Sequence, residues 1–228
     1  MLVDVIILTN SDVNSFYCHR TIHTLLNSET EIDFNIIVVE SGTNHEHIYK
    51  GLCNTYLHPN EKFNYNRFLN FGSKYCKGEW VVISNDDVSY ELEWFSQILK
   101  VHHQRPDIKS FSPRDPLFFM AFWANTFISR EHTYQESYQV SKFLMGWCLI
   151  IKMDAFKEIC PFDELFDMYY QDNDYAETIK SKGIKHALVK NSIVSHYNTL
   201  NIRVLEVTAK PKMEEDEQKF RNKWKIYT

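Results

Sequence analysis

The chain has 228 residues, of which 44% are hydrophobic and 24% are charged. These proportions exclude wholesale disorder, and the length suits one large domain or two small ones. Lys and Arg number 25 against 30 Asp and Glu, so the formal net charge is −5. Because proteins whose main partner is nucleic acid usually carry a basic excess, the charge argues against that class.

Cysteine usage and hydropathy point to an intracellular chain. The five cysteines show no Cys-x-x-Cys spacing, which argues against a structural zinc site and suits a reducing compartment. No apolar run approaches the ~20 residues of a membrane span, and the N-terminus lacks the basic start of a signal peptide. We therefore expect a cytoplasmic protein with no integral membrane span.

The first 105 residues alternate buried strands with helices. Apolar β-branched runs predict the strands, and apolar residues at helical spacing predict the helices. The strands fall at residues 3–8, 34–39 and 80–84, the helices at 15–26, 65–76 and 92–103, and a short helix with a further strand at 48–57. This alternation predicts an α/β fold, a mostly parallel central sheet flanked by helices.

The second half is less regular. Residues 109–139 are rich in aromatic side chains and are interrupted by Pro113 and Pro116, so we expect irregular structure there. Further elements are predicted beyond them: strands at 143–152 and 185–194, and helices at 154–159, 175–182 and 214–224. No repeat or linker is evident. We expect one domain, with a first half (1–105), a second half (106–200) and a helical tail (201–228).

Polar side chains follow three of the predicted strands at the point where each strand ends. Ligand sites of parallel sheets lie beyond the carboxyl ends of the strands, so these residues are expected to converge. They are Thr9-Asn10, Glu40-Ser41 and Asn85-Asp86-Asp87. The last group contains adjacent carboxylates, whose repulsion a cation would offset. Their oxygen atoms suit Mg²⁺ or Mn²⁺, although Asn and Asp also favour ordinary turns.

Two later features could join such a site. The run Gln171-Asp172-Asn173-Asp174 precedes a predicted helix, so its acidic residues either cap that helix or face a cleft. His196 follows the strand at 185–194 and is either a structural histidine or a ligand of the cation near Asp87.

Taken in chain order, residues 3–197 resemble family-two inverting glycosyltransferases, which are nucleotide-sugar-dependent enzymes of the GT-A fold. The resemblance lies in short motifs whose order and spacing agree with that family. They are Thr9-Asn10, Glu40-Ser41-Gly42, Asn70-Phe71-Gly72, Lys77-Gly78-Glu79, Asn85-Asp86-Asp87, Met145-Gly146-Trp147, Phe162-Asp163-Glu164, Gln171-Asp172-Asn173-Asp174 and His196.

The resemblance implies a role for each of these regions. Asp172 would be the catalytic base, Asp87 and His196 would bind the metal, and Gly146 and Trp147 would bind the acceptor. The aromatic residues from Phe118 to Trp123 would form a sugar platform or belong to the core. The nucleotide-sugar would contact residues of the first half, namely Thr9, Asn10, Glu40, Arg67, Asn70, Asn85 and Asp86.

The resemblance further implies Mn²⁺ or Mg²⁺ as cofactor, a donor that is preferably UDP-linked and a glycan or glycoconjugate acceptor. Two residues depart from the family pattern, because Asn85 replaces the first acid of Asp-x-Asp and Gln171 replaces the Glu before Asp172. These departures keep open a non-catalytic carbohydrate-binding protein on the same scaffold. A pyrophosphorylase would need a Gly-rich basic loop after the first strand, and a metal-dependent phosphoesterase would need more metal ligands.

Overall fold

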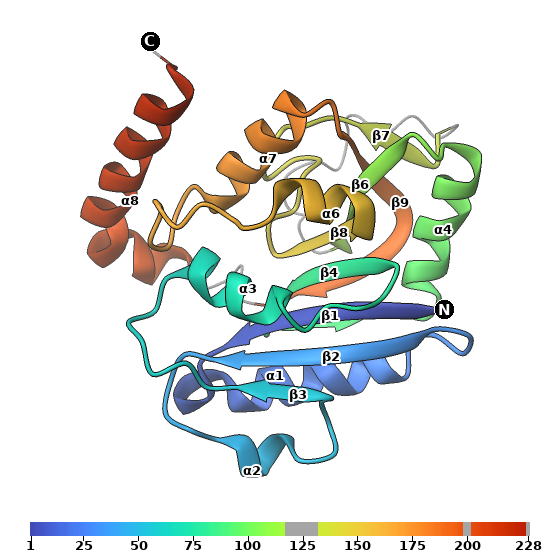
Figure 1. The fold of residues 1–228 in the computed structure, drawn as a ribbon, viewed down its shortest axis with the longest axis horizontal. Helices are drawn as coiled ribbons and strands as arrows, with labels where there is room; N and C mark the ends of the chain where they lie inside the picture. Colours follow the sequence, from blue (N-terminus) through green and yellow to red (C-terminus); the bar gives the residue numbers. More distant parts are fainter. Residues whose placement is uncertain (117–131, 198–201, 227–228) are drawn as a thin grey trace.

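The computed structural model describes residues 1–116, 132–197 and 202–226 (Figure 1). The strands of the first half are parallel, as the alternation of elements predicts. They are β1 (Leu2–Thr9), β2 (Asp33–Glu40), β3 (Thr55–Leu57) and β4 (Trp80–Asn85). β1 lies between β2 and β4, and its register places Thr9 beside Glu40 and Leu8 beside Asn85. The polar ends of these three strands therefore meet at one edge of the sheet.

The chain after β4 extends the same sheet in mixed directions. Its strands are β5 (Val88–Tyr90), β6 (Ile108–Arg114), β7 (Tyr134–Glu136), β8 (Cys148–Lys152) and β9 (Lys185–His196). β8 runs antiparallel to both β4 and β6, whereas β6 and β9 are parallel. The strand order among the described residues is β3-β2-β1-β4-β8-β6-β9-β5, and β7 pairs with β9. β8 thus joins the two halves.

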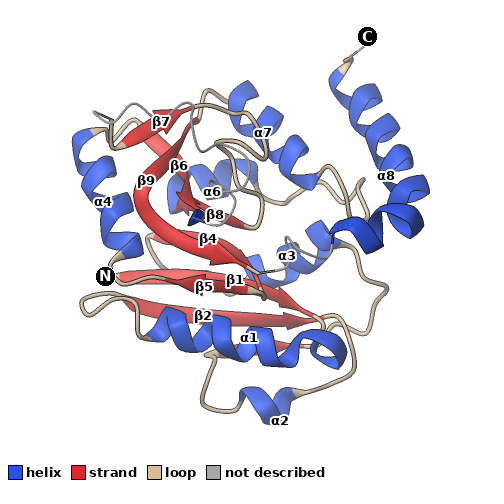
Figure 2. Ribbon diagram, turned by 180° about the vertical axis from the view of Figure 1, so that it is seen from behind, coloured by secondary structure: helices blue, strands red, loops and turns tan. Residues whose placement is uncertain are grey.

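Helices cover both faces of this sheet (Figure 2). α1 (Ser11–Leu26), α2 (Glu46–Tyr49) and α4 (Trp94–Gln104) pack on one apolar cluster, which includes Val5 and Ile7 of β1. α3 (Tyr65–Ser73), α6 (Met153–Ile159) and α7 (Gln171–Ser181) pack on the other, which includes Ile6. Successive residues of a strand point to opposite faces, so apolar runs are what a sheet buried on both sides requires.

The last helix, α8 (Ile202–Trp224), is longer than the predicted 214–224 segment and lies beside the loop that leads into α7 (Figures 1 and 2). Within the part of the chain that the structure describes, none of the helices combines the length and apolar character needed to cross a membrane.

The prediction of irregular structure across 109–139 was wrong at both ends, where β6 and β7 form. β6 contains Ser110, Ser112 and Pro113, which lowered its apparent strand propensity. Both serines are buried, and their hydroxyls have partners: Ser110 Oγ lies 2.6 Å from Tyr175 OH, and Ser112 Oγ accepts from Met145 N at 2.9 Å. The proposed aromatic platform from Phe118 to Trp123 lies outside the described residues.

Candidate functional site

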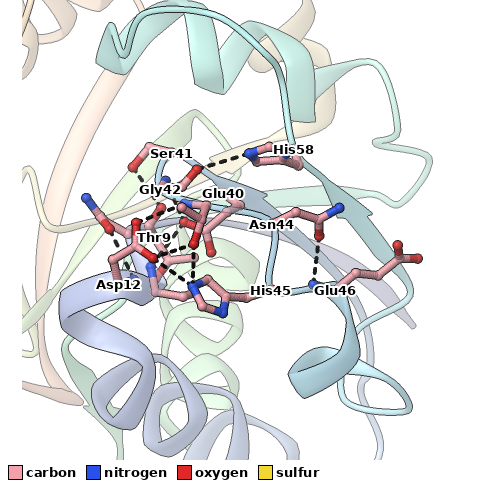
Figure 3. A network of polar contacts seen from close by, with 12 residues as sticks. Thr9, Asp12, Glu40, Ser41, Gly42, Asn44, His45, Glu46 and His58 are labelled. Atoms are coloured by element: carbon pink, nitrogen blue, oxygen red, sulfur yellow. Dashed lines mark hydrogen bonds and ion pairs between the residues drawn. The ribbon is translucent and has the colours of Figure 1, made fainter.

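The turn after β1 and the turn after β2 are tied together by Glu40, at the edge where the polar strand ends meet. Glu40 is fully buried, and its Oε1 accepts from the backbone N–H groups of Ser11 (3.1 Å) and Gly42 (2.7 Å) (Figure 3). The other carboxylate oxygen, Oε2, is buried and has no hydrogen-bond partner within the described part of the chain. Asn10 is the N-cap of α1 and accepts from Asp12 N at 3.2 Å. These bonds fix the backbone on which a ligand at this edge would rest.

A second contact in this region, between Asp12 and the turn after β2, is not evident from the sequence. Asp12 accepts from Thr43 N at 2.9 Å, and its Oδ1 lies 2.8 Å from His45 Nε2 (Figure 3). The hydrogen bonds from Thr43 and His45 lower the pKa of Asp12 to about 2. Gly42 permits this approach, since a Cβ there would lie 2.5 Å from Asp12 Oδ2. Gly42, two residues after the acidic end of β2, is the one sequence signal for this contact.

Asp86, which follows β4, is hydrogen-bonded to Thr9 at the end of β1. Thr9 Oγ1 donates to Asp86 Oδ2 at 2.7 Å, and Asn14 Nδ2 lies 3.4 Å from the other oxygen. Burial raises the pKa of Asp86 to about 6, and the neighbouring Asp87 contributes to the rise. Asp86 is thus a buried link from the end of β4 to the end of β1 and to α1.

Asp87 and His196 face each other across the β5–β9 pair. Val88 is registered opposite His196, which brings His196 Nε2 to 3.1 Å from Asp87 Oδ1 and 3.3 Å from Asn85 Nδ2. The ring of Trp147 stacks on His196 with centroids 5.3 Å apart and planes at 12°. The sequence indicated Asp87 and His196 as candidate ligands of one cation, although they lie more than 100 residues apart in the chain.

The Asp87–His196 pair fits a divalent cation. Asp87 is buried, and its Oδ1 lies 3.1 Å from the imidazole Nε2 of His196 with no hydrogen-bond partner among the residues that the structure describes. A carboxylate oxygen and an imidazole nitrogen are both accepted by Mn²⁺. Among the described residues there is no group of three or more His, Cys, Asp or Glu side chains that could hold a metal.

A cavity of about 390 Å³ lies next to His196 of this pair. Asn85 and His196 line one side, and Gly146 and Trp147 line another. The first residues of α7 complete the wall with Gln171 and Asp172. The structure thus brings Asn85, Gly146, Trp147, Asp172 and His196 to one cavity, from elements of both halves.

Asp172 lies in the first turn of α7 and packs directly on Gly146. A Cβ at Gly146 would lie 2.7 Å from Asp172 Cβ and 2.9 Å from its Oδ2. Burial raises the pKa of Asp172, while the backbone N–H of Asn173, at 2.9 Å from Oδ1, acts in the opposite direction. A carboxyl group whose pKa is raised towards neutral pH is a candidate for acid–base chemistry.

The structure does not bring Arg67 and Asn70 to the cavity. Both lie on α3 and contact the segment before α7: Arg67 Nε donates to Glu164 Oε2 at 2.8 Å, and Asn70 bonds both Phe162 N and Phe162 O. Tyr65, Asn66 and Leu69 of the same helix line the cavity instead. The Asn-x-Gly motif at Asn70 therefore holds the Phe162–Glu164 motif in place.

Comparison with known proteins gives a family and a fold. The model of the family "Glycosyl transferase family 2" matches residues 5–160. Among proteins with curated descriptions, none matches the chain significantly. Several hundred chains of solved structures are similar in fold, 343 in all.

Three of these structures share 12–14% sequence identity with the chain, which is evidence of the fold alone. GalNAc-T7, crystallised with UDP, GalNAc and Mn²⁺, has a TM-score of 0.64 over 86% of this chain and 44% of its own. The mannosyltransferase PcManGT from Pyrobaculum calidifontis, in complex with GDP-Man and Mn²⁺, has a TM-score of 0.66 over 90% and 61%. S. aureus TarS 1–349 has a TM-score of 0.61 over 92% and 64%.

The chain spans between 44% and 64% of the length of these solved neighbours. The fold is the GT-A fold that the sequence motifs predicted. Since the family model covers more than half of the chain, from β1 through α6, the protein belongs to glycosyl transferase family 2.

Proposed function

We propose that the protein transfers a sugar from a nucleotide-diphosphate donor to an acceptor hydroxyl with inversion at the anomeric carbon. The observation that carries the proposal is the cavity in which His196 of the candidate cation pair and Asp172 line the same space. If the donor diphosphate binds near the Asp87–His196 pair, the donor sugar would lie between that pair and the carboxylate of Asp172. Family membership supports the reaction class.

The donor would lie across the ends of β1, β2 and β4. Thr9, Asn10 and Glu40 shape that edge, and Asn85 with Asp86 would lie near the ribose and diphosphate. Arg67 and Asn70 would support the donor side through the Phe162–Glu164 segment rather than by contact. Two neighbours were solved with UDP or GDP-Man, each with Mn²⁺, and we propose a UDP-linked donor with Mn²⁺ or Mg²⁺ here.

In this mechanism Asp172 accepts the proton of the acceptor hydroxyl while the acceptor oxygen bonds to the anomeric carbon. The bond from that carbon to the diphosphate oxygen breaks in the same step, which inverts the configuration. Asp87 and His196 would hold a divalent cation, which when bound supplies positive charge next to the departing diphosphate. Trp147 presents an aromatic face to the acceptor, which we propose is a glycan or glycoconjugate.

The whole chain is proposed to act as one domain, with donor contacts mainly from residues 1–105, acceptor contacts from 106–200 and a helical tail over 201–228.

All five cysteines are free, which supports a reducing compartment such as the cytoplasm.

A second candidate function is carbohydrate binding without transfer. Asn85 and Gln171 favour it, because neutral amides stand where the family usually has acids. Gln171 lines the cavity, and its Nε2 is buried with no hydrogen-bond partner among the described residues. A buried donor of this kind could bond an oxygen atom of a ligand.

A panel of nucleotide-sugars, with and without Mn²⁺, separates the two functions. We expect release of the nucleoside diphosphate with one donor class, loss of that release in EDTA and recovery on adding Mn²⁺ or Mg²⁺. Asp172→Asn should lower turnover by about 10²- to 10⁴-fold while donor affinity stays within twofold. Glycan binding with no nucleoside diphosphate release from any donor would favour the second function.

A further inference from the structure

The C-terminal helix α8 holds the loop that delivers Asp172 to the cavity. Asp216 of α8 is fully buried, and its Oδ2 accepts from the backbone N–H groups of Met168 (3.3 Å) and Tyr169 (3.1 Å). One turn further along α8, the ring of Phe220 packs on Tyr170 with centroids 5.4 Å apart. Three consecutive residues before α7 are therefore fixed by one helix.

The same helix also holds α7 after Asp172. Lys223 Nζ lies 2.7 Å from Asp174 Oδ1 and 2.9 Å from its Oδ2, and Trp224 Nε1 donates to Oδ1 at 2.8 Å. Lys223 also bonds Asp163 Oδ2 at 2.7 Å, on the segment held by α3. Asp174 is buried, so both of its carboxylate oxygens rely on these donors for hydrogen bonds.

The start of α7 has acidic residues in its first turn but no side-chain cap. Its N-cap is Tyr170, whose side chain makes no capping hydrogen bond and whose φ is 65°, in the left-handed region. Non-glycine residues in this region are held by surrounding contacts rather than by local preference. Here those contacts come from α8, at Tyr170 before Asp172 and at Asp174 after it.

We propose that α8 is a positioning element of the active site, in which Lys223 and Trp224 orient Asp172 through Asp174. The inference rests on the proposed function, since it assigns Asp172 the role of base. α8 lies beyond residues 5–160, which the family model matches. Its contacts make Asp174, the second acid of the Gln171–Asp174 motif, an anchor for the first turn of α7.

The experiment compares four variants in the full chain. Lys223→Met removes the positive charge, Lys223→Arg keeps it, and Trp224→Phe removes the indole N–H but keeps an aromatic ring. The matched control is Lys210→Ala on the same helix, where the side chain is 72% exposed and its carboxylate partner Glu214 lies 3.9 Å away. Three quantities are measured: kcat, the donor Kd, and hydrogen exchange of the first-turn amides of α7.

We expect Lys223→Met and Trp224→Phe to lower kcat by about 10- to 100-fold, because a displacement near 1 Å at the reacting group has effects of this size. The donor Kd should stay within twofold, and the α7 amides should exchange faster. Lys223→Arg should recover most of kcat, and Lys210→Ala should match the wild type. If Lys223→Met does not fold, Trp224→Phe and Lys223→Arg still carry the comparison.

Unchanged kcat and unchanged exchange in Trp224→Phe and Lys223→Met would overturn the inference, as would a loss of donor affinity equal to the loss of kcat. If Asp172→Asn abolishes transfer while these variants do not, only the role of α8 fails. If the wild type transfers from no donor, the proposed function fails, and the exchange rates alone then decide whether α8 orders the start of α7.

Discussion

Gly146 shows how one missing side chain sets the position of the candidate base. The backbone of Gly146 lies against Asp172, and any Cβ there would meet Asp172 Cβ at 2.7 Å. Gly146→Ala should push the carboxylate away from its place in the cavity and lower turnover by about 10-fold or more. Steady-state kinetics with a donor-binding titration tests this. Weaker donor binding with unchanged turnover would assign Gly146 to the donor site instead.

Asp172 itself should reduce the stability of the fold at neutral pH. Burial raises its pKa above the ordinary value of 3.8, so the native state retains a proton that the unfolded chain releases as pH rises between the two pKa values. The wild type therefore loses stability across that window, and Asp172→Asn does not. We expect Asp172→Asn to melt higher at pH 7 and to approach the wild type below pH 3.8, in thermal unfolding scans.

At the scale of single residues, the sequence indicated the candidate site residues more readily than the side chains that support them. Asp87, Asp172 and His196 stood out because acids and a histidine follow strands or precede a helix. The anchoring roles of Asp12 and Asp174 depend on partners 31 and 49 to 50 residues away, which no local pattern reveals. Arg67 and Asn70 were assigned to the donor by motif, whereas their bonds lead to another loop.

Between elements, β6, β9 and α7 are joined by a buried chain of polar groups. His186 Nε2 donates to Phe143 O at 3.2 Å, because a carbonyl can only accept. Its Nδ1 lies 2.7 Å from Ser110 Oγ, which lies 2.6 Å from Tyr175 OH. Burial lowers the pKa of His186 and favours its neutral form, and the three elements share one hydrogen-bonded seam.

This seam should make the fold sensitive to acid. Burial lowers the pKa of His186 from 6.5 to about 4, so the unfolded chain binds more protons than the native state in that window. Stability is complete above pH 6.5 and falls as pH drops toward 4, by about 3 kcal/mol in total from this group. Urea unfolding of the wild type and His186→Gln at several pH values tests this, and equal pH slopes would contradict it.

Secondary structure was predictable where burial coincides with apolar sequence. β1, β2 and β4 are nearly uniform apolar runs, and each appeared at its place. β6 was missed because its buried faces carry Ser110 and Ser112, whose polarity is satisfied by partners distant in sequence. The start of α7 was placed at Tyr175 instead of Gln171, because Tyr170 enters the helix from a left-handed conformation that sequence patterns do not encode.

For the whole molecule, a ligand that spans the two halves should stabilise the native state by mass action. At free donor concentrations of 100 times Kd with Mn²⁺, the expected gain is about 2.7 kcal/mol, or roughly 5–10 °C in Tm for a chain of this size. Differential scanning fluorimetry measures the shift. Asp87→Ala should lose the part of the shift that depends on metal. An equal shift with and without EDTA would argue against a cation at Asp87 and His196.

The antiparallel strand β8 has a mechanical consequence for ligand binding. Its backbone is hydrogen-bonded to β4 of the first half and to β6 of the second, so the two halves form a single continuous sheet rather than two hinged lobes. Moving the two halves apart would break the backbone bonds between β4 and β8 and those between β5 and β9. We therefore expect the Asp87–His196 pair and Asp172 to keep a nearly constant separation before and after a ligand binds.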